Sequence, residues 1–262
     1  MWTDQILSRL KRPISQEMLL CYPTLVSTND TAKELAVAGA LGGTTVIADS
    51  QTGGRGRMGR SFHSPAGCGI YLSRILRPGC SPTQLMHLTC AVAVTVCDAI
   101  EKACGFRPGI KWVNDLIAHK RKLGGILTEM SLHTNGNVNY CVIGIGINCA
   151  ATAMPAELSS IAISLEEALG HPVERDAVIV ALMDSLSDME DRLTDHQYWI
   201  RRYRADCVTL GNEIRVIAQP PYFAKALDVD ENGALVLSLP DGTEKIIAAG
   251  EVSIRGMYSD PE

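Results

Sequence analysis

The feature that most constrains this 262-residue chain is a segment at residues 111–129, which reads as a hairpin and carries four cations and two carboxylates. A second cationic element, the glycine–arginine loop at residues 53–60, precedes it, although the formal net charge of the chain is −5. Two concentrated cationic elements in an acidic chain indicate an anionic ligand, and phosphate is the commonest one. The pattern therefore predicts nucleotide chemistry.

Composition limits the class of protein. With 46% hydrophobic residues, the chain can bury one substantial core and also carry a small second domain. Its mildly acidic balance argues against a surface that grips nucleic acid through the phosphates. The cysteines, nine in number, never show Cys-x-x-Cys spacing, so neither a zinc site nor a disulfide framework is predicted, and we expect reduced, mostly buried thiols.

The N-terminus has no targeting pattern, and no apolar stretch reaches the ~18 residues of a membrane span, so we expect a cytoplasmic protein without a membrane partner. Residues 1–20 hold at most one short helix. We therefore expect no winged-helix domain for reading DNA.

Apolar periodicity and turn residues predict a mixed α/β domain at residues 1–208 and a small barrel-like β domain at 209–262. Expected helices follow Asn29, Ser164 and Glu174, with a further one near 198–207. A long core helix follows the capping box at residues 81–84 and ends at Gly105. The expected strands are residues 44–48, 69–76, 139–148, 213–217, 234–239 and 251–254.

Two common nucleotide-binding motifs are excluded. The spacing Gly54-x-Gly56-x-x-Gly59 formally matches the dinucleotide fingerprint, but residues 61–67, which follow it, cannot open the required helix. No segment ends in the Gly-Lys-Ser/Thr of a phosphate-binding loop. Ordinary Rossmann and P-loop chemistry are therefore not expected.

Several motifs in a fixed order resemble those of the biotin protein ligase family, and the likeness runs from about Tyr22 to the C-terminal β domain. They are Ser27-Thr28-Asn29, the loop Gly54-Arg55-Gly56-Arg57, Lys111-Trp112-x-Asn114-Asp115, Lys122-x-Gly124-Gly125-Ile126-x-x-Glu129 and Gly144-x-Gly146-x-Asn148.

This resemblance implies a mixed-sheet catalytic domain like that of class II synthetases and a C-terminal SH3-like domain. It also implies a reaction in two steps that uses biotin and ATP with Mg²⁺. The biotin carboxylate attacks the α-phosphate to give biotinyl-5′-AMP, and a lysine of a biotin carboxyl carrier protein domain then attacks this acyl-adenylate.

The resemblance also implies site residues. The biotin-binding set is Ser27, Thr28, Asn29, Gln51, Arg55, Gly56, Arg57, Lys122 and Gly124. The ATP- or adenylate-binding set is Arg55, Arg57, Arg60, Phe62, Lys111, Asn114 and Asn148. The catalytic set is Arg57, Lys122, Lys111 and Asp115, and Asp115 is also the candidate magnesium ligand.

Physical arguments support the charged members of these sets. Arginine forks bind carboxylate and phosphate oxygens, so Arg55 and Arg57 suit a loop that closes over an anionic intermediate and excludes water. Lys122 would offset charge at the α-phosphate. Asp115 could hold magnesium, take a proton from the acceptor lysine, or simply pair with Lys111 in a turn. Asn114 and Asn148 suit either ligand binding or a structural role.

Two positions depart from the family pattern. Phe62 stands where a tryptophan is common, which keeps a stackable ring but loses the indole donor. Val113 stands where proline is common and loses its fixed φ.

We therefore expect a monofunctional ligase without repressor activity, with homodimers expected over monomers. The alternatives are a lipoate-type acyl ligase with the same adenylate chemistry, and a biotin-binding sensor without transfer activity.

Overall fold

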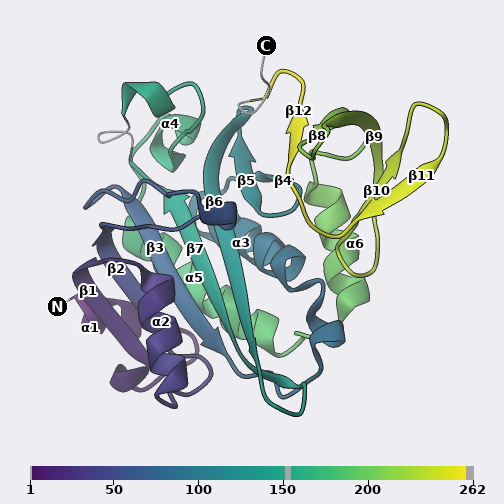
Figure 1. The fold of residues 1–262 in the computed structure, drawn as a ribbon. Coiled ribbons are helices and arrows are strands. Elements are labelled where there is room, and N and C mark those ends of the chain that lie inside the picture. The colour runs from purple at the N-terminus through teal and green to yellow at the C-terminus, as the bar shows by residue number, and fades with distance from the viewer. Residues whose placement is uncertain (1, 151–154, 258–262) are drawn as a thin grey trace.

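The structure is a computed structural model that describes residues 2–150 and 155–257. Its centre is a mixed sheet with strand order β1-β2-β3-β7-β6-β5-β4 (Figure 1). Only β1 and β2 run parallel, and every other neighbouring pair is antiparallel. The strands are β1 (Leu19–Leu25), β2 (Thr45–Gln51), β3 (Gly69–Leu76), β4 (Gly109–Lys111), β5 (Asp115–Ala118), β6 (Arg121–Leu132) and β7 (Val138–Asn148).

Helices cover both faces of this sheet because its strands bury alternate residues on opposite sides. On β2, Val46 packs with the cluster under α2 (Thr28–Val37), while its neighbour Ile47 packs into the larger core. That larger core lies between the sheet and the helices α3 (Leu88–Cys104) and α5 (Arg175–Glu190). The remaining helical segments are α1 (Trp2–Leu7), η1 (Gln16–Met18), η2 (Arg57–Gly59), η3 (Pro82–Leu85), η4 (Ala156–Leu158), α4 (Leu165–Leu169) and α6 (His196–Asp206).

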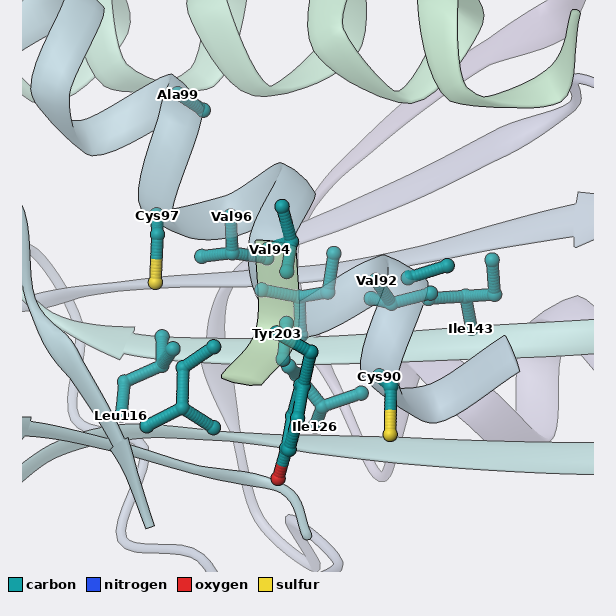
Figure 2. Packing of buried hydrophobic residues seen from close by; sticks show 14 of the residues in the cluster. Cys90, Val92, Val94, Val96, Cys97, Ala99, Leu116, Ile126, Ile143 and Tyr203 are labelled. Carbon is teal, nitrogen blue, oxygen red and sulfur yellow. The ribbon is translucent and has the colours of Figure 1, made fainter. Parts of the chain in front are cut away.

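Helix α3 is the centre of the core, and Figure 2 shows its apolar side chains packed against strand residues and Tyr203 of α6. The predicted capping box is present, with Ser81 as N-cap and Pro82 at the first position, but it opens the short η3 turn before α3 begins. Gly105 ends α3 in the left-handed conformation, at φ 66°.

The segment Pro82–Cys104 is long and apolar enough to cross a membrane by length and composition. This corrects the expectation that no stretch of such length exists. Its most apolar 18-residue window is 72% buried inside the fold, as expected of a core helix.

The C-terminal domain is a separate antiparallel sheet with strand order β11-β10-β9-β8-β12, which confirms the predicted β domain. Its strands are β8 (Glu213–Val216), β9 (Tyr222–Val229), β10 (Leu235–Ser238), β11 (Glu244–Ile247) and β12 (Val252–Ile254). The sequence analysis did not predict strands β9 and β11. Lys225 and Asp228 interrupt β9, and the exposed Glu244 and Lys245 open β11, so charged residues break the apolar pattern of both strands. The exact domain boundary stays a prediction.

A turn of the C-terminal domain is fastened to the catalytic domain. The Trp112 indole Nε1 donates a hydrogen bond to the Gly233 carbonyl at 3.0 Å, and Arg204 of α6 donates to the Val229 carbonyl at 2.6 Å. Trp112 is only 3% exposed, and the peptide bond between Trp112 and Val113 is cis. The β4–β5 hairpin is therefore held against the second domain.

The cysteines are mostly buried, as expected. Five are buried and the other four are half-buried. Burial raises the pKa of the Cys141 thiol to about 12, and the pKa of Cys90 and Cys97 rises further for the same reason. These thiols are packing residues of the core.

Candidate active site

A polar cavity opens on the α2 side of the sheet, where the N-terminus of α2, the glycine–arginine loop, the β4–β5 hairpin and strands β6 and β7 meet. Residues 250–252 of the C-terminal domain complete its wall. The predicted site residues that line the cavity are Ser27, Thr28, Asn29, Gln51, Arg55, Gly56, Arg57, Arg60, Phe62, Lys111, Asn114, Asp115 and Lys122.

The glycine–arginine loop forms a small hairpin of its own. Arg55 pairs with Ser61 as an isolated β-bridge, and the Gly56 amide donates to the Arg60 carbonyl at 2.7 Å. Gly54 is buried at the base of the loop, where a Cβ would overlap the Phe62 carbonyl oxygen. Glycine is therefore required there by close backbone approach.

Three arginines of this loop make contacts on different sides of the cavity. Arg55 pairs with Asp30 of α2 at 2.9 Å. Arg57 donates to the Asn114 side-chain oxygen at 3.0 Å and to the Gly250 carbonyl at 3.3 Å. Arg60 forms a bidentate pair with Glu251, in which Nη1 donates to Oε1 at 2.6 Å and Nη2 donates to Oε2 at 2.5 Å. The loop thus reaches from the catalytic domain to the C-terminal domain.

The predicted biotin-binding end of the cavity is an ordered polar network. Ser27 caps α2, and its side chain accepts a hydrogen bond from the Asp30 amide. The Gln51 side-chain oxygen accepts from the Thr28 amide at 2.8 Å. The buried Ser73 hydroxyl lies 2.6 Å from the Asn29 Oδ1 atom, and Asn29 Nδ2 donates to Glu129 at 2.9 Å.

Two glycines of β7 allow these side chains to approach the sheet. A Cβ at Gly144 would overlap the Asn29 side-chain oxygen, and one at Gly146 would lie 2.7 Å from the Phe62 ring. Glycine is therefore required at both positions by protein side chains that pack against β7. Phe62, which replaces the common tryptophan, packs edge-on against Tyr71 with ring centroids 6.4 Å apart.

Lys122 and Asp115 form the central ion pair of the cavity, with Nζ and Oδ1 2.6 Å apart. A register shift between β5 and β6 separates the pairing of Leu116 from that of Ile117, next to the position where Lys122 pairs. Gly125 leaves room beside the pair, since its missing Cβ would lie 3.5 Å from the Lys122 Nζ atom. The neighbouring Arg121 is half-buried and pairs with Glu167 at 2.5 Å.

Lys111 is a buried cation that lines the cavity and is only 3% exposed. Burial lowers the pKa of its ammonium group to about 8, against the opposing attraction of Asp115. Asp115 lies opposite Lys111 in the β4–β5 pairing. A bound anion would stabilise the charged form of this lysine.

The carboxylates of the cavity limit how a metal could be held. Within residues 2–150 and 155–257, no group of three or more His, Cys, Asp or Glu residues is arranged to hold a metal ion. Asp115 supplies one carboxylate, next to Lys122. This donor set fits a magnesium ion held mainly by substrate phosphates and water, because Mg²⁺ commonly uses only one or two protein carboxylates in such sites.

Two predicted residues lie outside this cavity. Gly124 packs against β7, where a Cβ would overlap the Gly146 carbonyl oxygen, and Gly125 lines the cavity instead. Asn148 donates to the Lys122 and Ile163 carbonyls at 3.4 and 3.2 Å. It lines an adjoining cavity that shares Phe62 and Lys122 with the first.

The sequence reading missed residues that complete the site. Ser73 lies in an apolar strand, and Asp30 reads as an ordinary acidic residue in the first turn of a helix. Gly250 and Glu251 reach the loop from the C-terminal domain. No local pattern could link them to residues so distant in the chain.

Comparison with protein families gives two matches. Residues 22–148 match the model described as the biotin/lipoate A/B protein ligase family, and residues 209–255 match the biotin protein ligase C terminal domain. The bifunctional ligase/repressor BirA of Bacillus subtilis (strain 168) is 36% identical over 245 residues, which cover 92% of this chain and 75% of that protein.

Further similarity extends to other ligases. The biotin--[acetyl-CoA-carboxylase] ligase of Mycobacterium tuberculosis (strain ATCC 25618 / H37Rv) is 31% identical over 237 residues, covering 86% of this chain and 85% of that protein. The structure of the biotin protein ligase from Aquifex aeolicus in complex with biotin and ATP matches with a TM-score of 0.77 and 27% identity, over 90% of this chain and 98% of that one.

Proposed function

Because this chain belongs to the biotin protein ligase family and is a biotin-ligating enzyme, we propose that it forms biotinyl-5′-AMP from biotin and ATP and transfers the biotinyl group to a carrier lysine. The acceptor would be one lysine of a biotin carboxyl carrier protein domain. The observation that carries this proposal is the single cavity in which Arg57, Lys111 and Lys122 surround a polar pocket next to α2.

In the first step, a biotin carboxylate oxygen bonds to the α-phosphorus, the bond to the bridging oxygen breaks, and pyrophosphate leaves. The two reactants are both anionic, so their approach needs positive charge. Lys111 and Lys122 supply it from β4 and β6, and Arg57 supplies it from the loop. Mg²⁺ that arrives with ATP would be held by the phosphates and Asp115, and would neutralise phosphate charge.

In the second step, the acceptor amine attacks the acyl carbon, AMP leaves with the bonding electrons, and the amine loses a proton. Asp115 is a carboxylate of the cavity that could take this proton, as an alternative to its role toward magnesium. The loop excludes water from the mixed anhydride while the acceptor arrives.

A lipoate-type acyl ligase is the second candidate, since the matching family model includes lipoate ligases. The same adenylate chemistry would serve it, with a different acid in the pocket. Retention of Arg57 and Lys122 in the cavity speaks against a sensor that lacks transfer activity.

We also propose a cytoplasmic homodimer that does not bind operator DNA. The net charge of −5 supports the absence of DNA binding. Light scattering tests the dimer. A biotin-dependent footprint on operator DNA would contradict the proposed absence of DNA binding.

The deciding experiment measures the intact mass of a biotin carboxyl carrier domain after incubation with the protein, ATP and Mg²⁺. Parallel samples contain biotin, lipoate or no acid, and Lys122→Ala serves as the impaired control. A gain of one biotinyl group with biotin alone supports the proposal, while modification by lipoate alone would replace it with the second candidate.

If neither acid is transferred, release of pyrophosphate decides the matter. Biotin-dependent release of pyrophosphate would support adenylation and indicate that the carrier domain in the assay is not the acceptor. No release with either acid would overturn the catalytic proposal.

A further inference from the structure

A row of alternating charges runs from the glycine–arginine loop to the biotin-binding end of the cavity. Arg55 in the loop pairs with Asp30 at 2.9 Å, and Asp30 pairs with Lys33 at 3.0 Å on the same helix. Lys33 also pairs with Glu129 of β6 at 2.9 Å. The other carboxylate oxygen of Glu129 accepts a hydrogen bond from the Asn29 side-chain nitrogen.

The inner end of this row is fixed. Ser73 is fully buried and directs its hydroxyl to the Asn29 side-chain oxygen, which turns the Asn29 nitrogen toward Glu129. The first turn of α2 is fixed as well, because Ser27 caps it and the helix dipole favours an acidic side chain at Asp30. Asp30 is thus a positioned anion.

The outer end is the exposed one. The Arg55 side chain is 53% exposed and that of Asp30 is 26% exposed. An isolated ion pair at such a surface contributes little to stability. Its contribution increases when it belongs to a network of charges with fixed partners. On the opposite side of the cavity, Arg60 and Arg57 hold the same loop to Glu251 and Gly250.

We infer that Asp30 is a positioning residue: by holding Arg55, it keeps the glycine–arginine loop closed over the cavity and sets how long the acyl-adenylate stays bound. This inference rests on the proposed adenylation. An acyl-adenylate that escapes reacts with any accessible amine, so the Asp30–Arg55 pair would also set the fidelity of transfer to the carrier.

The test compares wild type with Asp30→Asn, which removes the charge and keeps the shape. Each protein is loaded with radiolabelled biotin, ATP and Mg²⁺, desalted, and mixed with serum albumin, whose lysines report released biotinyl-AMP. We expect Asp30→Asn to label albumin about two- to fivefold faster, with single-turnover pyrophosphate release within about twofold of wild type.

Two variants separate positioning from general damage. Asp30→Glu retains the anion and should return labelling toward the wild-type rate. Glu34→Gln removes an exposed acid from the same helix and should leave labelling unchanged. Added salt should speed labelling by wild type more than by Asp30→Asn, because salt screens an exposed ion pair.

The inference is overturned if Asp30→Asn labels albumin at the wild-type rate, or if Glu34→Gln speeds labelling equally. It is also overturned if pyrophosphate release and labelling change together in Asp30→Asn, because that result indicates a damaged pocket. Failure of wild type to release pyrophosphate with biotin would instead refute the proposed function.

Discussion

Lys111 shows at the scale of one residue how the site opposes the stability of the fold. Its ammonium group is buried, and burial lowers its pKa to about 8. In the unfolded chain the pKa would be near ~10.4. Between these values the unfolded state binds more protons, so this residue makes the free energy of unfolding rise with pH across that window. Below pH 8 the cost of burial is fully present.

We therefore expect Lys111→Met to increase the free energy of unfolding at pH 7 by ~1–3 kcal/mol and to abolish adenylation. Urea denaturation measures the first effect and pyrophosphate release the second. The gain in stability should shrink as pH rises past the native pKa. The exposed Lys120→Met is the matched control, and an equal gain there would contradict the assignment.

The same lysine should couple ligand binding to protons. A bound anion raises its pKa, so binding of biotin with a non-hydrolysable ATP analogue should take up more protons at pH 8.5 than at pH 7. Calorimetry in two buffers with different ionisation enthalpies measures the uptake. Equal uptake by Lys111→Met would show that another group is responsible.

Gly144 is a second position where a single added atom would disturb the site, because a Cβ there would overlap the Asn29 side-chain oxygen. Gly144→Ala should displace Asn29, lower the melting temperature and weaken biotin binding about tenfold or more, which is ~1.4 kcal/mol. Calorimetric titration with biotin measures the affinity. Adding Asn29→Ala should recover stability without recovering affinity, and additive stability losses would refute the overlap.

At the scale of elements, the β4–β5 hairpin depends on the second domain through the Trp112 hydrogen bond to Gly233. Trp112→Phe keeps an aromatic ring and leaves a buried carbonyl without its donor. We expect a loss of ~1–3 kcal/mol in stability, faster hydrogen exchange in the turn at residues 230–234, and slower adenylation because Lys111 is adjacent.

Trp199→Phe provides the comparison. Its indole donates to the Arg192 carbonyl at 2.8 Å, among the helices and outside the cavity lining. It should lose similar stability while adenylation remains unchanged. Equal loss of adenylation in both variants would mean that Trp112 acts through stability alone.

Elements with strong local signals were also those that the sequence predicted. The Ser81 capping box, the glycine stop at Gly105 and the apolar strand β7 depend on residues close together in the chain. Strand β11 was missed because its side chains face solvent, and hydrogen bonding to β10 defines it. Local apolar pattern could not reveal such a strand.

At the scale of the molecule, the sequence motifs located most of the cavity lining, because the cations and glycines that approach a ligand are restricted in type. They did not locate Asp30, Ser73 or Glu251. These residues contact other side chains, so their residue types do not indicate a ligand site. The roles of individual site residues stay predictions until the variants are measured.

The contacts of Gly250 and Glu251 with the loop also bear on the order in which a newly made chain completes its site. Synthesis proceeds from the N-terminus, and domains generally fold as they emerge. The catalytic sheet can therefore form while the second anchor of the loop is still missing. Non-local contacts also form slowly. A nascent chain would therefore hold the loop through catalytic-domain contacts such as that of Asp30, and the C-terminal domain would supply the remaining contacts only when its folding is complete.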